Sequence, residues 1–213
     1  GTELGLILFG GLENRAYILE QKANRIFDTY FTYKINVFYK FNDIRTYSDV
    51  QIENSNNFSR EEVGKYRQIF YGLSLGIGSQ VGRFGNLIFE GRYQFDEIKN
   101  VDNEPIDPYK TKIVSLKIST TVDTQDKYPF PENGVFFSGF YETAFSVLGG
   151  EVGYYNLSLD YKSYFSLSNS SVISPKISFG FADKTLPLSE QYSLGGQESF
   201  YGMNYSEYRG RQI

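Results

Sequence analysis

One pentapeptide of the chain carries a residue pattern that is known from catalysis. Gly72-Leu73-Ser74-Leu75-Gly76 matches the G-x-S-x-G nucleophile elbow of serine hydrolases, in which a sharp strand-to-helix turn lifts the serine oxygen. Here the alternation of apolar and polar residues continues through the motif to Ile77, which predicts an extended strand. The chain has no histidine to act as a base and no Asp-Gly motif for a Ser–Asp dyad. We therefore expect no catalysis at Ser74.

A second stretch places two carboxylates three residues apart, at Asp123 and Asp126. A cation site would need further ligands, and the sequence places none nearby. The stretch continues through two prolines to Asn133-Gly134, so it predicts a turn in which the Asp side chains accept local backbone N–H groups. The chain has no Cys and no His, which excludes disulfides, zinc–thiolate sites and thiol catalysis. We expect no metal, no cofactor and no enzymatic activity in this chain.

The composition indicates β-rich material. The 213 residues include 19 Tyr, 19 Phe and 21 Gly, with no Trp. The 21 basic and 25 acidic residues are scattered, so we expect no nucleic-acid partner. There is no apolar run long enough for a transmembrane helix. There is also no basic region followed by an apolar one, so we expect any signal peptide to lie outside residues 1–213. Because the chain begins and ends inside an alternating pattern, we expect residues 1–213 to be one domain that is truncated at both ends.

Period-two alternation dominates the sequence. Between residues 27 and 41 one face is aromatic or aliphatic throughout, apart from Thr29, and between 153 and 167 Ser163 is the main exception on such a face. We find no convincing amphipathic helical repeat. The alternation predicts about ten strands, over residues 2–10, 13–21, 27–41, 64–79, 86–98, 111–122, 134–148, 151–168, 171–181 and 204–213. Pro175 lies inside the ninth of these and cannot donate to the ladder, so we expect a β-bulge there.

Strand length and loop order distinguish a soluble sandwich from a membrane barrel. Several predicted strands have about 13–18 residues, long enough to cross a membrane at a tilt and extend beyond it. The longest connections, 42–63, 99–110 and 182–203, are the third, fifth and ninth, so they leave the same end of the sheet. Outer-membrane barrels likewise have long loops at one end and short turns at the other. The predicted fold is an all-β, transmembrane antiparallel β-barrel.

The alternation also assigns the two faces of the barrel wall. Apolar residues such as Phe31, Leu75, Phe89 and Leu159 are predicted to face lipid. The opposite parity predicts a lumen lined by polar side chains, including Glu90, Arg92, Glu142, Asp160 and Lys162.

Two motifs on this background resemble a known family. The first is the turn motif Asp123, Asp126, Pro131 and Gly134, and the second is the loop motif Gly195, Gly196, Phe200, Tyr201, Gly202 and Met203, followed by Tyr208-Arg209-Gly210. Both are similar to motifs of the BamA/TamA outer-membrane barrel superfamily, also called bacterial surface antigens. Gln125 replaces the arginine usual in the family's Asp-Thr-Arg-Asp turn.

The resemblance implies that the chain covers about ten strands, the third to the twelfth, of a barrel of about sixteen. It also implies that the loop motif folds back into the lumen as a plug, where its arginine meets an acidic residue on a later strand. Tyr201 stands in the place of that arginine, so this ion pair cannot form here. The alternative is an extracellular loop that does not enter the lumen.

The glycine-rich region around Arg83 is similar to the C-terminal barrels of patatin-like outer-membrane phospholipases. This likeness implies a membrane anchor or translocator for such a phospholipase, with any lipase activity in an upstream domain. The alternatives are an outer-membrane protein assembly or secretion barrel of the BamA/TamA or two-partner secretion type, and a diffusion pore or unrelated β protein. We expect location in the bacterial outer membrane. The expected partners are outer-membrane lipid and a passenger or upstream periplasmic domain.

Overall fold

The computed structural model describes residues 2–23, 26, 29–52, 57–102, 106–168, 170–196, 199–200 and 202–213. Within these residues, one antiparallel sheet has the order β1-β2-β3-β4-β5-β6-β7-β8-β10, and β9 pairs with the end of β8. Its strands are β1 (Thr2–Gly10), β2 (Asn14–Ala23), β3 (Phe31–Gln51), β4 (Phe58–Val81), β5 (Gly85–Asp102), β6 (Tyr109–Asp123), β7 (Gly134–Ala144), β8 (Tyr154–Ser168), β9 (Ser171–Ile173) and β10 (Lys176–Ala182). The prediction of an all-β antiparallel sheet is confirmed.

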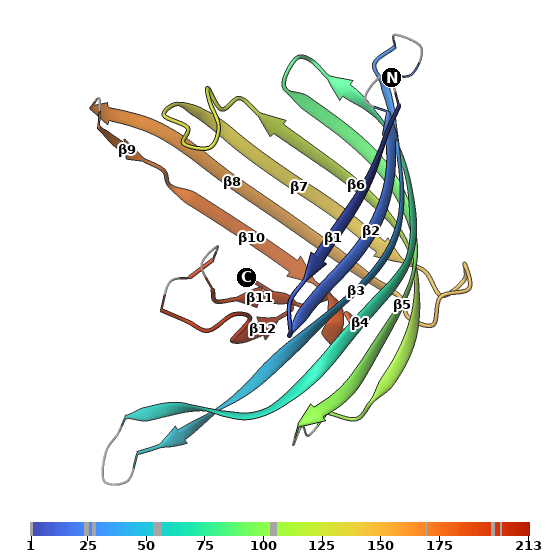
Figure 1. The fold of residues 1–213 in the computed structure, drawn as a ribbon, viewed down its shortest axis with the longest axis vertical. Helices are drawn as coiled ribbons and strands as arrows, with labels where there is room; N and C mark the ends of the chain where they lie inside the picture. The colour runs from blue at the N-terminus through green and yellow to red at the C-terminus, as the bar shows by residue number, and fades with distance from the viewer. Residues whose placement is uncertain are drawn as a thin grey trace.

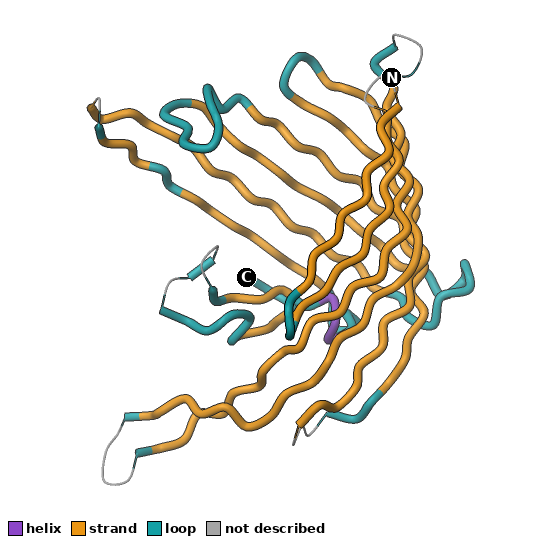
Figure 2. The backbone as a smooth tube through the Cα atoms, in the orientation of Figure 1, coloured by secondary structure: helices purple, strands orange, loops and turns teal. Residues whose placement is uncertain are grey.

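The sheet curves strongly but does not close on itself (Figure 1). Two short strands, β11 (Tyr192–Leu194) and β12 (Tyr208–Gly210), pair with each other and lie inside the curve, and a 3-10 turn, η1 (Leu188–Glu190), precedes them. Figure 2 shows η1 in purple beside the concave wall. Within the described residues, no helix combines the length and apolar content needed to cross a bilayer.

The two faces of the wall differ as the alternation predicts. The outer, convex face is apolar: Phe31, Leu75, Phe89 and Leu159 are between 37% and 63% exposed. Exposed side chains of this size would be unfavourable in water, and a lipid environment accounts for them. On β3, the apolar outer residues from Phe31 to Tyr39 span about 27 Å along the strand at about 3.4 Å per residue, which at a barrel tilt is close to the apolar height of an outer-membrane barrel.

Strands β3 and β4 are longer than the sequence predicts. They pair from Phe31 and Ser79 to Gln51 and Phe58, with one register shift near Thr46. Beyond the apolar band both faces carry polar residues, so the alternation ends although backbone pairing continues. The result is a two-stranded ribbon that projects past the rest of the sheet (Figure 1).

The β-bulge predicted at Pro175 is wrong. Phe165 pairs with Ile173 before the proline and Lys162 pairs with Lys176 after it. Two residues on each strand lie between these pairs, so the register is unbroken. The Pro175 carbonyl still accepts a hydrogen bond from the Ser163 N–H at 3.2 Å. Only the bond that needs a proline N–H is lost, so the ladder is interrupted without a bulge.

The strand predicted over 204–213 is also wrong. Asn204 and Glu207 close a turn, in which the Asn204 N–H donates to Glu207 Oε2 at 2.7 Å and Ser206 has a φ of 54°. Only Tyr208–Gly210 forms a strand, and it pairs with β11. The chain then reaches β10, where Gly180 and Ile213 exchange two backbone hydrogen bonds of 2.9 and 3.0 Å. The segment therefore leaves the sheet edge at β10, passes through the concave side and returns to the same edge.

The turn between β6 and β7 is held by local hydrogen bonds. Asp123 accepts the N–H of Gln125 at 3.0 Å, and Asp126 accepts the N–H of Glu132 at 3.0 Å. The bond from the Glu132 backbone is the main reason why the pKa of Asp126 lies below its ordinary value.

Gly134 ends this turn with a φ of 109°, a backbone conformation that other residues rarely adopt. A Cβ at this position would also collide with the Thr124 carbonyl oxygen. We expect Gly134→Ala to lower the free energy of unfolding by about 1–3 kcal/mol, measured by urea unfolding in detergent micelles. Gly153→Ala is the matched control because a Cβ there meets only the Ala144 carbonyl oxygen at 3.6 Å. Equal stability of the two variants would contradict the prediction.

Candidate functional site

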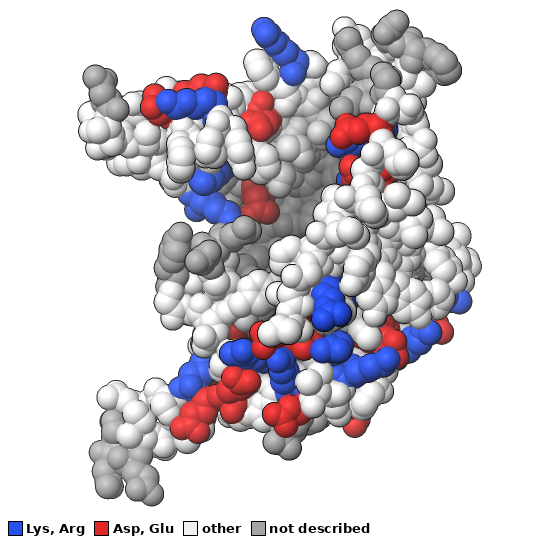
Figure 3. Space-filling model, in the orientation of Figure 1, with Lys and Arg blue, Asp and Glu red and all other residues white. Residues whose placement is uncertain are grey.

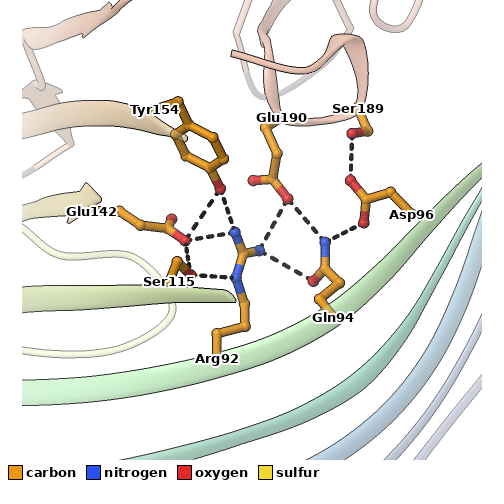
Figure 4. Close-up of polar contacts among 8 residues, drawn as sticks. All are labelled: Arg92, Gln94, Asp96, Ser115, Glu142, Tyr154, Ser189 and Glu190. Carbon is orange, nitrogen blue, oxygen red and sulfur yellow. Dashed lines mark hydrogen bonds and ion pairs between the residues drawn. The ribbon is translucent and has the colours of Figure 1, made fainter. Parts of the chain in front are cut away.

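A buried ion network joins the barrel wall to the segment inside it (Figure 4). Its centre is Arg92 on β5. Because side chains alternate along a strand, Arg92 points to the inner face while its neighbours Gly91 and Tyr93 are on the outer face. Arg92 Nη2 donates to Glu142 Oε1 at 2.5 Å and to the Tyr154 hydroxyl at 2.8 Å. Arg92 Nη1 donates to Glu190 Oε1 at 3.0 Å. One guanidinium thus links strands β5, β7 and β8 to η1.

The remaining donors of Arg92 are also used. Nε donates to the Ser115 hydroxyl at 3.3 Å, and Nη1 donates to Gln94 Oε1 at 3.1 Å. The Ser115 hydroxyl in turn donates to Glu142 Oε1 at 2.6 Å. A guanidinium offers five N–H groups in a rigid fork, and each of them has an acceptor here. The side chain is only 16% exposed, and that of Glu142 only 4%, so these contacts are formed away from bulk water.

The network extends along β5 to a second contact with η1. The Gln94 amide donates to Glu190 Oε1 at 2.9 Å and to Asp96 Oδ1 at 2.5 Å. The Ser189 hydroxyl donates to Asp96 Oδ2. Ser189 and Glu190 are therefore both held by inward side chains of one strand. Breaking such a buried network by removing its cation leaves uncompensated charge, which is costly.

Three further contacts hold the rest of the segment against the wall. The Tyr192 hydroxyl lies against Asn156 Oδ1 and the Leu157 carbonyl of β8. Arg209 donates to the Tyr66 hydroxyl at 2.7 Å, from β12 to β4. Glu207 pairs with Arg60 of the β3–β4 ribbon at 3.1 Å. The segment from 183 to 210, which we call the lumenal segment, is therefore attached to β4, β5 and β8.

We expect Tyr192→Phe to weaken the attachment at β8 without affecting Arg92. The phenol loses its hydroxyl, so buried oxygens of Asn156 and Leu157 lose a donor, at a cost of about 1–3 kcal/mol. Limited proteolysis of the folded protein should then cleave the lumenal segment faster than in the wild type. Tyr205→Phe is the control because Tyr205 is 63% exposed. Cleavage as slow as in the wild type would contradict this role.

The structure places the five polar residues predicted for the lumen on the inner face. Arg92 and Glu142 meet directly in the network. Asp160 instead accepts a hydrogen bond from the Ser178 hydroxyl at 2.6 Å, and the Lys162 ammonium lies 4.9 Å from the Tyr164 ring centre. Glu90 lines a cavity of about 540 Å³ beside Arg92, together with Glu20, Lys34 and Lys40. The five predicted residues therefore share the inner face but lie in two places. Arg92, Glu142 and Glu90 are at the network and its cavity, and Asp160 and Lys162 are apart from it.

The predicted loop motif forms a glycine-rich turn in the middle of the lumenal segment. Gly195, Gly196 and Gly202 all have a φ between 90° and 119°. The Gly196 N–H donates to the Met203 carbonyl at 3.2 Å, and Phe200 is 54% exposed. Tyr201 lies outside the described residues. The wall contacts that the structure shows come from residues on either side of this motif.

The remaining chemical candidates have structural roles. Ser74 stands in the middle of β4, where its hydroxyl accepts a 3.1 Å hydrogen bond from Asn36, so the segment is extended and not a nucleophile elbow. In the described part of the chain, no three carboxylate, His or Cys side chains gather in a way that could hold a metal ion.

Sequence reasoning missed most of the network. Gln94, Asp96 and Ser115 share the parity of the predicted lumen residues and could have been found from it. Glu190 and Ser189 could not, because no pattern links a loop residue to a strand more than ninety residues earlier, as the separations of 98 and 93 positions show.

A curved antiparallel sheet with long tilted strands, an apolar outer face and a polar inner face defines the class of outer-membrane β-barrels. Residues 8–213 match the Omp85 superfamily domain, and the chain belongs to this family. The domain is accordingly a non-enzymatic barrel wall of the bacterial outer membrane.

Among solved structures, the crystal structure of BamA from Haemophilus ducreyi lacking POTRA domains 1–3 is similar to this chain. The TM-score is 0.75 at 18% sequence identity, and the likeness covers 97% of this chain and 41% of that one. At this identity the likeness is one of fold. The chain spans less than half of the BamA chain that it matches. A search of curated proteins gives no match.

Proposed function

We propose that this domain is the barrel of an outer-membrane protein assembly or secretion system, with the lumenal segment as its resident plug. The observation that carries the proposal is the Arg92 network, which fixes the segment to the inner wall through buried charged contacts. Membership of the Omp85 superfamily and the BamA-like fold support it. In this function the wall holds the segment in place at rest, and client protein engages the barrel when the segment or the wall moves.

A plain diffusion pore fits the site less well. A pore needs an open lumen, whereas here Ser189, Glu190 and Tyr192 are bonded to two strands of the wall, β5 and β8. The space that remains beside η1 is a pocket of about 540 Å³ with both acidic and basic side chains, including Glu20 and Lys34. A diffusion pore would also gain nothing from a buried salt bridge to its own loop, since such a bond costs desolvation.

The role of anchor or translocator for a patatin-like phospholipase stays a prediction. Two of the glycine positions that suggested it have local explanations: a Cβ at Gly78 would collide with the Leu87 carbonyl oxygen of β5, and Gly82 has a φ of 63°. Neither the fold nor the comparisons favour this branch. We propose outer-membrane lipid as one partner and an upstream or passenger domain as another.

The function is tested by reconstituting the full chain into liposomes. A urea-denatured β-barrel client is added, and its folding in the bilayer is followed by heat-modifiable gel mobility and protease protection. We expect client insertion to be at least about tenfold faster than in empty liposomes, which corresponds to 1.4 kcal/mol of activation free energy. Delivery of an unfolded client into the liposome interior would indicate the secretion branch. Client behaviour equal to that in empty liposomes, together with steady ion conductance, would overturn the proposal in favour of a pore.

A further inference from the structure

The outer face of the sheet changes from aromatic to charged within two outward positions along strands β2 to β5. Tyr17, Tyr39, Tyr71 and Phe95 are register partners on four neighbouring strands, and their rings contact one another at centroid distances from 5.2 to 6.4 Å. Rows of tyrosine and phenylalanine mark the interface levels of membrane barrels. Toward the long loops, the charged outward positions at or beyond this row form the outer charged band: Glu13, Arg15, Asp43, Arg45, Lys65, Arg67, Glu97, Lys99, Lys110 and Lys112. On β3 and β4, Phe41 and Ile69 lie between the aromatic row and the first charged residue. Figure 3 shows charged side chains gathered across this end of the molecule.

Part of the band is internally neutralised. Glu13 pairs with Lys65 at 2.7 Å and with Arg45 at 3.1 Å. Arg67 holds Asp43 through two hydrogen bonds of 2.6 and 2.9 Å. Glu97 pairs with Lys99 at 3.1 Å, so each carboxylate of the band is bound to a particular cation. These pairs therefore leave the other cations free for an external anion.

Three cations of the band form no ion pair with a described residue: Arg15, Lys110 and Lys112. The Arg15 guanidinium donates to the Gly11 carbonyl at 3.2 Å and lies 5.5 Å from the Phe41 ring centre. The Lys110 ammonium lies 5.0 Å from the ring centre of Phe95, and Glu97 is its register partner. At Lys112 the carboxylate of Glu151 binds the backbone N–H at 2.8 Å.

Aromatic rings hold two of these cations, Arg15 and Lys110, at a defined level. Arg15 and Arg67 approach the same Phe41 ring, at 5.5 and 4.5 Å. Lys110 lies over both Tyr71 and Phe95. A cation over an aromatic face keeps its charge while its stem covers apolar surface. Directly above a lipid-facing row, such cations stand at the level of lipid headgroups.

We propose that Arg15, Lys110 and Lys112 of the outer charged band bind the phosphate groups of anionic lipid headgroups in the leaflet at the long-loop end. Headgroup phosphate is the ligand that matches the position, because its acyl chains lie against the apolar rows below while its charge meets the band. Guanidinium and ammonium groups are the usual phosphate donors. Bound lipid would order this leaflet around β2 to β6. The inference depends on the barrel's place in the membrane and stands apart from the assembly or secretion role.

The test uses the full chain in phosphatidylcholine vesicles with about one fifth spin-labelled phosphatidylglycerol, a lipid whose phosphate is the only headgroup charge. Spin-label spectra give the fraction of the label held at the barrel surface. The triple variant R15Q/K110Q/K112Q should lower the association constant of phosphatidylglycerol relative to phosphatidylcholine by at least about tenfold, since each cation near an anionic leaflet contributes about a factor of five. Raising the salt concentration should reduce the wild-type preference in the same direction.

The matched control is K40Q/K117Q/K162Q, which removes three cations from the inner face. Each of these ammonium groups lies over an aromatic ring, as Arg15 and Lys110 do on the outer face, and the change in net charge is the same. We expect this variant to keep the wild-type preference. If the triple variant does not fold by heat-modifiable mobility, single K112Q carries the test, with an expected loss of about fivefold.

Two outcomes would overturn the proposal. One is a result of the variants: a preference that the outer variants leave unchanged would show that these cations hold no lipid, and an equal loss in the inner control would show an effect of net charge only. The other is complete displacement by inorganic phosphate at the concentration of the lipid headgroups, which would show a site for free anions.

Discussion

Replacing Arg92 with methionine is expected to lower the free energy of unfolding by about 3–5 kcal/mol, because the change leaves buried carboxylates without their cation. Glu142 and Glu190 both lose a charged donor, at Nη2 and Nη1 respectively. Methionine keeps the length and apolar stem of the side chain, so packing changes little. The loss should appear in urea unfolding of the protein in detergent micelles.

The same variant should release η1 from the wall. Proteolysis of the lumenal segment should become faster, and ion conductance of the reconstituted barrel should rise. Arg92→Lys should fall between wild type and Arg92→Met, since an ammonium keeps the charge but cannot reproduce the fork of contacts. Lys162→Met is the matched control: it removes an inner-face cation that lies over Tyr164. Stability within about 0.5 kcal/mol of the wild type for Arg92→Met, the range of ordinary surface changes, would contradict the role of the network.

Leu159→Arg is expected to lower stability by about 2–4 kcal/mol in lipid, provided that the position is near the middle of the bilayer. Leu159 lies on the outer face of β8, between Tyr155 and Phe165, and is 37% exposed. A guanidinium there has no partner and must be accommodated among acyl chains. The measurement is the urea midpoint of the barrel refolded in phosphatidylcholine bilayers.

Ser138→Arg tests whether the cost comes from lipid exposure. Ser138 lies on β7 as the register partner of Asp160, so an arginine at this position faces the lumen and an opposite charge. We expect a much smaller loss than at Leu159. Equal losses at the two positions, or unchanged folding of Leu159→Arg, would show that the outer face has been assigned incorrectly.

The sequence predicts the wall well because one physical rule governs it. Each apolar side chain that faces lipid alternates with one that faces the lumen, so Phe89 and Glu90 already reveal the two faces. The rule stops where both faces meet water. For this reason it underestimates the pairing of β3 and β4, which continues beyond Phe41 to Gln51. It also cannot distinguish a bulge from a simple interruption at Pro175, since this depends on which ladder bond the proline lacks.

The contacts of the lumenal segment follow no such rule. Glu190 lies in a short 3-10 turn after Pro187, in a stretch with no periodic pattern. Its partner Arg92 is a polar residue on a strand with several others, among them Glu90 and Gln94. Which of them meets Glu190 depends on the curvature of the whole sheet and on the path of the chain after β10. Parity therefore predicts the lumen lining, and only the tertiary structure assigns its contacts.

Cysteine cross-linking between Ser189 and Asp96 in the membrane-embedded protein tests the central claim most directly. The chain contains no native Cys, so the pair S189C/D96C stands on a clean background. The Ser189 hydroxyl donates to Asp96, and we predict rapid disulfide formation under mild oxidation, seen as a mobility shift that a reductant reverses. In S189C/E97C the second cysteine moves by one residue to the outer face, and no shift is expected. Failure of the first pair to cross-link, or equal cross-linking of both, would contradict a lumenal segment fixed to the inner wall of β5.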